Sequence, residues 1–237
     1  MKMNQNSNKL NPVIIVMAKA PRIGQVKTRL RPFLNGYQCA ELAICFLKDT
    51  VAKAKSVSQN VIVAFTPADG EKEIENLLPG GIALIKQEGN DLGERLASAI
   101  KFGENKNFNS IIVIGTDSPT LPPDYIKAAI QLFRKKQTRI VLGAAKDGGY
   151  YLIGLRESET GIFENVEWSS EKVFEQTAAN ARKIYGCEPT EIPVWYDVDT
   201  PNDLAFLNGE FLENKNFLAT APETANWLHE NKTLFDS

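Results

Sequence analysis

Short apolar runs alternate along the chain with longer segments in which apolar residues recur at helical spacing. The apolar runs have the length of buried strands, and we expect strands at residues 13–17, 61–65, 82–86, 111–115, 140–144, 151–155 and 191–195. The segments between them predict helices at residues 36–55, 71–78, 91–102, 122–135 and 169–184. This alternation of strands and helices is typical of an α/β fold with a mostly parallel sheet.

The length and charge of the chain narrow the class of protein. A chain of 237 residues offers enough apolar surface for a single α/β domain. Its 27 Lys and Arg nearly balance 29 Asp and Glu, and no block of like charge favours nucleic acid or an anionic membrane as a partner. The partners that we expect are therefore small molecules.

The two ends of the chain differ from its middle. Residues 1–11 are polar and lack the apolar stretch of a secretory signal, so we expect a disordered or extended N-terminus and a cytoplasmic protein. No apolar run is long enough to cross a bilayer. Residues 12–208 hold the alternating pattern of the predicted domain. Residues 209–237 favour a C-terminal helical extension, which packs either on the core or on a second subunit of a homodimer.

The cysteines and the histidine argue against several kinds of chemistry. Cys39, Cys45 and Cys187 form no C-x-x-C pair, so we expect reduced thiols without a special role. The single histidine of the sequence, His229, lies near the C-terminus, away from other candidate catalytic groups. The sequence therefore disfavours a Ser-His-Asp triad and a histidine-rich zinc site.

The loop after the first predicted strand is rich in cations, and ligands of such sheets bind outside the carboxyl ends of the strands. Lys19, Arg22, Lys27 and Arg29 share this loop with Gly24. Arginine and lysine bind phosphates, and a glycine lets the backbone approach an anion closely. The loop is either a phosphate clamp or a solvated basic surface. Its spacing matches neither the P-loop nor the G-x-G-x-x-G turn of dinucleotide-binding enzymes.

Aspartates follow two of the later strands. Asp117 comes directly after the strand expected at residues 111–115, ahead of a proline pair that begins a helix. A carboxylate at this point suits Mg²⁺ or Mn²⁺, although aspartate beside proline also serves as a cap. Residues 200–203 predict a capping box with proline at the first helical position. That cap leaves Asp197 and Asp199, just before it, without an explanation.

Asp147 precedes two glycines between two predicted strands. Asp-Gly and Gly-Gly are strong signals for a hairpin turn, so a plain turn is one interpretation. In the other, the turn lies over the site, Gly148 and Gly149 leave room for a ligand, and Asp147 reaches a metal. Clustered carboxylates destabilise a fold unless a cation lies among them. Asp117, Asp147 and Asp199 therefore fit around a metal-bound phosphate that faces the first loop.

Six segments, in order along the chain, carry a resemblance to a known superfamily. They are MAKAPRIGQVKTRL, GNDLGERL, GTDSPTLP, KDGGYYLIGL, VEWSSEKVF and DVDTPNDL. Together they resemble the nucleotide-diphospho-sugar transferase, or glycosyltransferase-A, superfamily, and most closely the radical-SAM/selenodomain-associated transferases. The first loop and the Asp-Val-Asp-Thr-Pro segment are also similar to those of the 2-phospho-L-lactate guanylyltransferases.

The resemblance implies a three-layer αβα sandwich with a mixed, mostly parallel sheet, and it implies roles for single residues. The metal, Mg²⁺ or Mn²⁺, is expected on Asp117, Asp199 and Asp147. Catalytic roles are expected for Asp117, Asp147 and Lys27. The nucleotide is expected on Lys19, Gly24, Lys27, Arg29 and Gly89. The second substrate is expected on Gly148, Gly149, Tyr150 and Trp168.

Three of these assignments have alternatives or limits. The residues after Gly89 begin a predicted helix, where Asp91 and Glu94 suit a plain capping box. Trp168 either closes over an acceptor or packs in the interior. Tyr150 and its neighbour alternate along a strand, so at most one of the two tyrosines is expected to face the site.

Three functions fit these features. The first is a metal-dependent transferase with a nucleotide-linked donor, similar to a glycosyltransferase, in which the metal and the loop cations stabilise the leaving diphosphate. The second is a nucleotidylyltransferase, which moves NMP from an NTP to a phosphorylated small acceptor. The third, from another class, is a non-catalytic nucleotide-binding protein. The three candidate metal aspartates argue against the third, because clustered carboxylates without a function cost stability.

Overall fold

A computed structural model describes residues 10–156, 159–214 and 216–235 of the chain. The disordered or extended segment expected at residues 1–11 falls largely on residues 1–9, which lie outside the described residues. Leu10 and Asn11 have no regular structure and lead into the first strand.

One seven-stranded sheet organises the described residues, in the order β3-β2-β1-β4-β6-β5-β7. The strands are β1 (Pro12–Lys19), β2 (Val61–Thr66), β3 (Ala83–Lys86), β4 (Ser110–Ile114), β5 (Ile140–Ala145), β6 (Tyr150–Leu155) and β7 (Thr190–Trp195). β6 runs antiparallel to both of its neighbours, β4 and β5, whereas the other pairs are parallel. The predicted mixed, mostly parallel sheet is confirmed.

The inner strands of the sheet are apolar because both of their faces are covered, whereas the outermost strands β3 and β7 are partly exposed. Along β1, Ile14 and Val16 turn to one face while Val13 and Ile15 turn to the other, and all four side chains are buried. A strand that is buried on both faces needs apolar residues at every position. This explains the short continuous apolar runs in the sequence.

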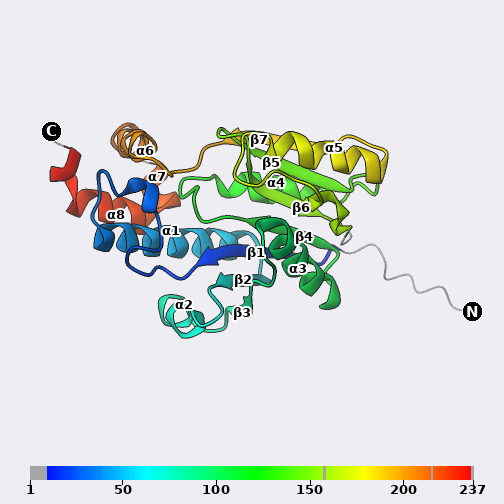
Figure 1. The fold of residues 1–237 in the computed structure, drawn as a ribbon, viewed down its shortest axis with the longest axis horizontal. Helices are drawn as coiled ribbons and strands as arrows, with labels where there is room; N and C mark the ends of the chain where they lie inside the picture. The colour runs from blue at the N-terminus through cyan, green and yellow to red at the C-terminus, as the bar shows by residue number, and fades with distance from the viewer. Residues whose placement is uncertain (1–9, 157–158, 215, 236–237) are drawn as a thin grey trace, which may run out of the picture.

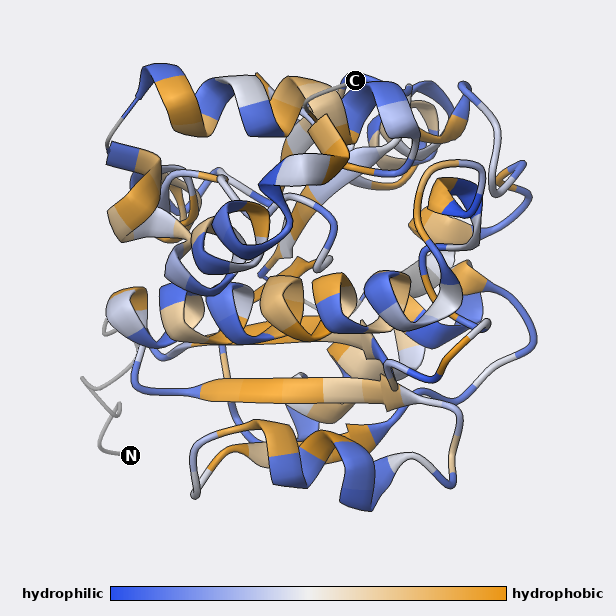
Figure 2. Ribbon diagram, turned by 90° about the vertical axis from the view of Figure 1, so that its left-hand side faces the viewer, coloured by the Kyte–Doolittle hydropathy of each residue, from blue (hydrophilic) through white to orange (hydrophobic). Residues whose placement is uncertain are grey.

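Helices cover both faces and form three layers with the sheet (Figure 1). One face carries α1 (Gly36–Val57), α2 (Glu71–Leu77) and α4 (Pro123–Leu132), and the other carries α3 (Leu92–Asn105) and α5 (Val173–Tyr185). The strands are largely apolar in Figure 2, whereas the helices alternate between apolar and polar residues. This arrangement is the expected αβα sandwich. In the described part of the chain, none of the helices combines the length and apolar character that a membrane span requires.

The last helices pack around α1 and the first loop. α6 (Pro201–Glu213), α7 (Asn216–Thr220) and α8 (Pro222–Glu230) form an apolar cluster with α1, which includes Phe46 and Trp227. α6 crosses the boundary expected at residue 208, so the division into a domain and an extension stays a prediction. The described residues also form short 3-10 helices at η1 (Thr28–Leu30), η2 (Thr160–Phe163) and η3 (Lys232–Phe235).

One predicted helix begins later than expected. Residues 169–172 form turns, and α5 starts at Val173. Ser169 has a φ of 66°, in the left-handed region that an α-helix excludes. The turn also packs closely on the β5–β6 connection, because a Cβ added to Gly148 would lie 2.2 Å from the carbonyl oxygen of Glu171. Tertiary packing therefore overrides the helical periodicity of these residues.

Candidate functional site

A cavity of about 490 Å³ opens at the carboxyl ends of β1 and β4. Its lining includes residues 25–29 and 115–117 with Lys19, Gln87, Leu92, Tyr150, Tyr151, Asp197 and Asp199. The carboxyl ends of parallel strands meet at one edge of a sheet, and the antiparallel β6 begins at this same edge. The cavity lies where ligands bind in sheets of this class.

The ammonium of Lys27 is buried in the wall of this cavity. Its Nζ lies 2.5 Å from Asp117 Oδ1, 2.8 Å from the carbonyl oxygen of Val198 and 3.3 Å from Asp199 Oδ1. Only 7% of the Lys27 side chain is exposed, against 47% for Asp117 and 35% for Asp199. Burial alone would lower the pKa of Lys27, but the charges of the two aspartates raise it. Three oxygen atoms thus converge on one cation position.

The backbone of the first loop and helix α1 hold Lys27 in this place. Lys27 has a φ of 47°, a left-handed conformation that costs energy for a residue with a side chain. Cys39 Sγ donates a hydrogen bond to the Lys27 carbonyl oxygen at 3.4 Å. The ring of Phe46 lies 5.1 Å from the ammonium. Both α1 residues are buried, so α1 supports the backbone and the side chain of Lys27 together.

Two other cations of the first loop lie at the cavity with less contact to the aspartates. Arg29 lines the cavity, lies 3.4 Å from Asp199, and keeps 67% of its side chain exposed. Lys19 Nζ donates to the carbonyl oxygen of Gln25 at 2.8 Å, within the loop itself. Gly24 has a φ of 75° and open space where a Cβ would lie. Gly24 therefore serves the turn of the loop and does not reach the cavity lining described for the chain.

The fourth cation of the loop, Arg22, turns away from the cavity. Its guanidinium lies 2.6 Å from Glu73, on α2, and 3.1 Å from Asp69, just before α2. The predicted four-cation clamp is therefore wrong for Arg22, because two carboxylates outside the site neutralise its charge. This ion pair instead ties the first loop to α2.

Two hydrogen bonds join the loop after β4 to the segment after β7, next to the aspartates. Ser118 Oγ donates to Asp197 Oδ1, and the Val198 N–H donates to the carbonyl oxygen of Asp117 at 2.8 Å. Burial raises the pKa of Asp197 to about 7, and the charges of the neighbouring aspartates add to this effect. Asp197 is therefore partly protonated near neutral pH.

The start of α6 follows its capping prediction. Thr200 accepts a hydrogen bond from the Asp203 N–H, and Asp203 accepts one from the Thr200 N–H, so the capping box is confirmed. Val198 is fully buried, whereas Asp197 and Asp199 line the cavity. Alternate side chains of this extended segment therefore point to opposite sides, as in a strand.

A second cavity, of about 330 Å³, adjoins the first. Arg29, Asp197 and Asp199 line both cavities. The other lining residues are Lys146, Asp147, Tyr196, Thr200, Asp203 and Phe206. Lys146 Nζ lies 5.6 Å from the centroid of the Tyr196 ring and 5.2 Å from that of Phe206. The two cavities therefore form adjacent chambers of one site, with shared residues between them.

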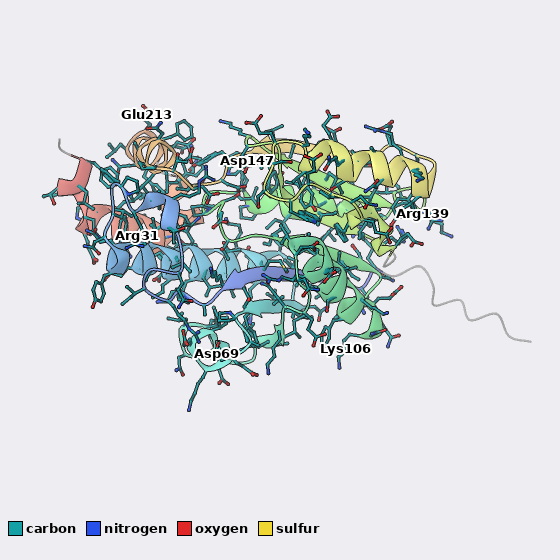
Figure 3. The ribbon with its side chains drawn as sticks, in the orientation of Figure 1. Arg31, Asp69, Lys106, Arg139, Asp147 and Glu213 are labelled. Carbon is teal, nitrogen blue, oxygen red and sulfur yellow. The ribbon has the colours of Figure 1, made fainter. Side chains whose placement is uncertain are left out.

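Asp147 lies on the second cavity and not beside Lys27. Its Oδ1 accepts a hydrogen bond from the Gly149 N–H at 2.9 Å, as a turn residue does. Figure 3 shows Asp147 near the end of β5 that faces α6. Among the described residues, no group of three or more His, Cys, Asp or Glu side chains is arranged to hold a metal ion. A third metal contact from Asp147 stays a prediction.

The glycine turn and the tryptophan expected at the second substrate lie outside the cavity linings described for the chain. Gly148 has a φ of 89°, and the backbone of Glu171 fills the room expected there for a ligand. Trp168 packs on α3, where a Cβ added to Gly93 would lie 2.7 Å from its ring. Packing is thus the observed role of Trp168, and Gly149 takes part in the turn.

Gly89, expected at the nucleotide, is not among the residues described as lining either cavity. Its φ is 135°, and a Cβ there would lie 2.5 Å from the Glu94 side chain. Nearby Gln87 lines the cavity, and its Nε2 donates to the carbonyl oxygens of Ala18 and Ala64. Gln87 was not predicted from the sequence because no motif marks it. Its place directly after β3, at the ligand-binding edge, is the signal that identifies it.

Both tyrosines at the start of β6 line the first cavity, against the expectation that at most one would. They pack on opposite faces of the sheet, as alternation requires. Because they occupy the first two positions of β6, the sheet ends beside them and both faces border the cavity. Lys146 and Phe206 of the second cavity were also missed. Lys146 directly precedes the recognised Asp147, whereas Phe206 had no signal in the sequence.

One family and one curated relative match the sequence. The profile of a family described as "Uncharacterized protein conserved in bacteria (DUF2064)" matches residues 49–170, just over half of the chain. The chain is also 26% identical over 200 residues to the 2-phospho-L-lactate guanylyltransferase of Methanocaldococcus jannaschii. That match covers 83% of this chain and 84% of the relative, which is a distant homologue.

Solved structures share the fold. A protein from Desulfovibrio desulfuricans G20, provisionally assigned as a nucleotide-diphospho-sugar transferase, has a TM-score of 0.87 and 27% identity, over 95% of this chain and 97% of that one. A cytidylyltransferase from Leptospira borgpetersenii serovar Hardjo-bovis has a TM-score of 0.56 and 15% identity over the same shares, which supports the fold alone. The fold is that of the nucleotide-diphospho-sugar transferases.

Proposed function

The chain belongs to the DUF2064 family of uncharacterised bacterial proteins, and from this premise and the geometry of the site we propose that it is a metal-dependent nucleotidylyltransferase. In the proposed reaction an oxygen atom of a small acceptor bonds to the α-phosphorus of an NTP. The bond from that phosphorus to the oxygen of the β-phosphate breaks, and pyrophosphate leaves. No covalent bond to the protein is needed.

One observation carries this proposal, the ammonium of Lys27 held between Asp117 and Asp199 at the cavity. Carboxylate and carbonyl oxygens are the ligands that Mg²⁺ and Mn²⁺ prefer, so the oxygens around this position fit such an ion. When bound, the ion would neutralise charge on the phosphates. Because this position has room for one cation, the ammonium of Lys27 has to move away from the aspartates when a metal ion binds there. The phosphates of a nucleotide would then accept the hydrogen bonds of the ammonium.

The nucleotide is proposed to occupy the first cavity, whose volume of about 490 Å³ lies within the range of small-molecule sites. Lys27 and the exposed Arg29 then face the phosphates, since both lie at the side of the cavity that holds the aspartates. Lys19 adds a third positive charge to the same lining. These cations stabilise the negative charge that grows on the leaving pyrophosphate.

The acceptor is proposed to occupy the second cavity, which meets the first at Arg29, Asp197 and Asp199. Lys146 and Arg29 give this chamber two cations that suit a phosphorylated acceptor, while Phe206 offers an apolar surface. Asp147 borders the same chamber, where it would take the proton of an acceptor that attacks through a hydroxyl, whereas an acceptor that attacks through its ionised phosphate needs no base. These roles replace the substrate contacts predicted from the sequence for Gly148, Gly149 and Trp168.

Glycosyl transfer from a nucleotide sugar is the second candidate function. The Desulfovibrio protein favours it, because its provisional assignment names a nucleotide-diphospho-sugar transferase. The guanylyltransferase favours nucleotidylyl transfer, and it is the relative with an assigned reaction at comparable identity. We therefore rank nucleotidylyl transfer first, which reverses the order expected from the sequence.

A thermal-shift screen tests the proposal. Nucleoside triphosphates and nucleotide sugars are added separately, each with and without MgCl₂, because a ligand that binds only the folded state raises the melting temperature. The expected result is a magnesium-dependent shift with one NTP, followed by pyrophosphate release when phosphorylated acceptors are added. Binding of a nucleotide sugar alone would favour the second candidate. No magnesium-dependent shift with any nucleotide would overturn both.

A further inference from the structure

Helix α1 buries two charged residues one turn apart, among mostly apolar side chains. Asp49 is 1% exposed and Lys53 is 4% exposed. Neither lines the two cavities described above. Buried charges lower stability unless their partners compensate them, and apolar residues of similar size often serve a core better. The partners of these two side chains therefore indicate what the charges do.

Lys53 bonds to the loop that carries Asp117. Its Nζ donates to the carbonyl oxygen of Pro119 at 2.7 Å and to that of Ser118 at 3.3 Å. The same loop is fixed on its other side, where Ser118 Oγ donates to Asp197. Burial lowers the pKa of Lys53 to about 7, but an amine keeps at least two N–H donors in either protonation state. Both bonds therefore persist across neutral pH.

Asp49 bonds to the first turn of α8. Its carboxylate accepts hydrogen bonds from the Glu223 N–H at 3.0 Å, the Thr224 N–H at 2.8 Å and Thr224 Oγ1 at 2.6 Å. The residue before α8, Ala221, has no side chain to cap the helix. Asp49 thus acts as the cap of α8 from a different helix. Figure 1 shows α8 lying along α1.

We propose that Lys53 is a positioning residue that fixes the Asp117 loop, and that Asp49 links it through α1 to α8. Helix α8 then stabilises the geometry of a site whose described lining includes none of its residues. This inference rests on the proposed function for its effect on nucleotide binding. Its structural part concerns the ligand-free chain alone.

Amide hydrogen exchange of the ligand-free protein tests the structural part. Two amides report on the loop, because the Leu121 N–H donates to the Ser118 carbonyl oxygen and the Val198 N–H donates to that of Asp117. The Lys53→Met substitution removes the donor and keeps a side chain of similar length. We expect exchange at both amides to accelerate at least tenfold relative to core amides of β2. A loss of global stability would instead accelerate the core amides equally.

Two further variants complete the exchange test. Thr224→Val removes one bond to Asp49 far from the loop, and we expect a smaller acceleration at the same two amides. Lys48→Met is the matched control, because Lys48 joins α1 to α8 through a surface ion pair with Glu223 at 3.4 Å. It should leave the loop amides unchanged. Equal exchange rates at the loop amides in all three variants would overturn the inference, and so would an acceleration that the core amides share. If Lys53→Met does not fold, the exchange rates of Thr224→Val decide the test.

Nucleotide binding tests the functional part. If wild-type protein binds an NTP with Mg²⁺, we expect Lys53→Met to weaken that affinity about tenfold and Lys48→Met to leave it unchanged. Wild-type affinity in Lys53→Met would show that the loop position does not matter for binding, which overturns this part. If wild-type protein binds no nucleotide, the proposed function fails, whereas the exchange experiment still decides whether Lys53 and α8 fix the loop.

Discussion

Replacing Lys27 by methionine should change metal affinity and nucleotide affinity in opposite directions. In the ligand-free protein the ammonium occupies the position between Asp117 and Asp199. A metal ion that binds alone must displace it. Lys27→Met removes this competitor, so Mn²⁺ alone should bind more tightly. The same change removes a cation from the phosphates, so the nucleotide should bind more weakly in the presence of Mg²⁺.

The structure sets the size of both effects. Because 47% of Asp117 and 35% of Asp199 are exposed, solvent screens their ion pairs with Lys27. Each pair then contributes about 1 kcal/mol, and the loss of both should tighten Mn²⁺ binding by about 2 kcal/mol, roughly 30-fold. A charge-assisted hydrogen bond to phosphate contributes about 1.5–3 kcal/mol, so nucleotide affinity should fall roughly 10- to 150-fold.

Electron paramagnetic resonance of free Mn²⁺ measures the first effect, and calorimetry of the magnesium nucleotide measures the second. Lys19→Met is the matched control, because it removes a charge from the same loop while its Nζ contacts Gln25 and neither aspartate. It should change Mn²⁺ affinity at most a few-fold through screened, longer-range attraction. Unchanged Mn²⁺ affinity in Lys27→Met would refute the competition between the ammonium and the metal.

Five further substitutions test the site. Asp117→Asn should abolish magnesium-dependent nucleotide binding in calorimetry while the melting temperature stays within a few degrees of wild type, and retained binding would contradict the metal role. Asp203→Ala should cost about 1 kcal/mol of unfolding free energy through loss of the α6 cap, with magnesium-dependent binding retained. Asp199→Ala should instead abolish magnesium-dependent binding without loss of unfolding free energy. If denaturant melts and calorimetry show the opposite effects for the two variants, Asp199 is not the metal ligand and Asp203 is not only a cap. The folded state raises the pKa of Asp197 from near 4 to about 7, so this carboxyl binds its proton more tightly when folded, and its contribution to stability falls as pH rises between those values. Asp197→Asn should therefore gain roughly 2–4 kcal/mol relative to wild type between pH 4 and pH 7, and parallel stability curves would show that the pKa is not raised. Lys146→Met should increase the KM of the acceptor more than that of the NTP, and equal increases would argue against the second cavity as the acceptor chamber.

The sequence predicted the fold better than it predicted the site. Strands that are buried on both faces leave continuous apolar runs such as that of β1, so their positions are visible in the residues alone. Their bounds are less visible, since β1 spans Pro12–Lys19 and the apolar run predicted only residues 13–17. The edge of the sheet that binds ligands also follows from the order of strands and helices. These local and topological signals correctly brought Lys27, Asp117 and Asp199 together. The closer resemblance to the radical-SAM/selenodomain-associated transferases stays a prediction.

Contacts between distant residues explain what the sequence did not reveal. Arg22 looked equivalent to Lys27 in the loop, and only the position of α2 decides that it pairs with Glu73. Gly148 looked like space for a ligand, yet a turn that follows in sequence fills it. Phe206 belongs to the second cavity through the packing of α6 and carries no motif. Such contacts depend on how whole helices dock, which local patterns do not encode.

The bonds from Asp49 to α8 also bear on how the protein is synthesised. The ribosome releases α1 long before residues 222–230, yet a buried Asp49 needs the α8 amides as partners. A nascent chain that pauses before this point leaves the carboxylate without them and the apolar side of α1 uncovered. We therefore expect α1 to reach its native packing only after α8 has left the exit tunnel.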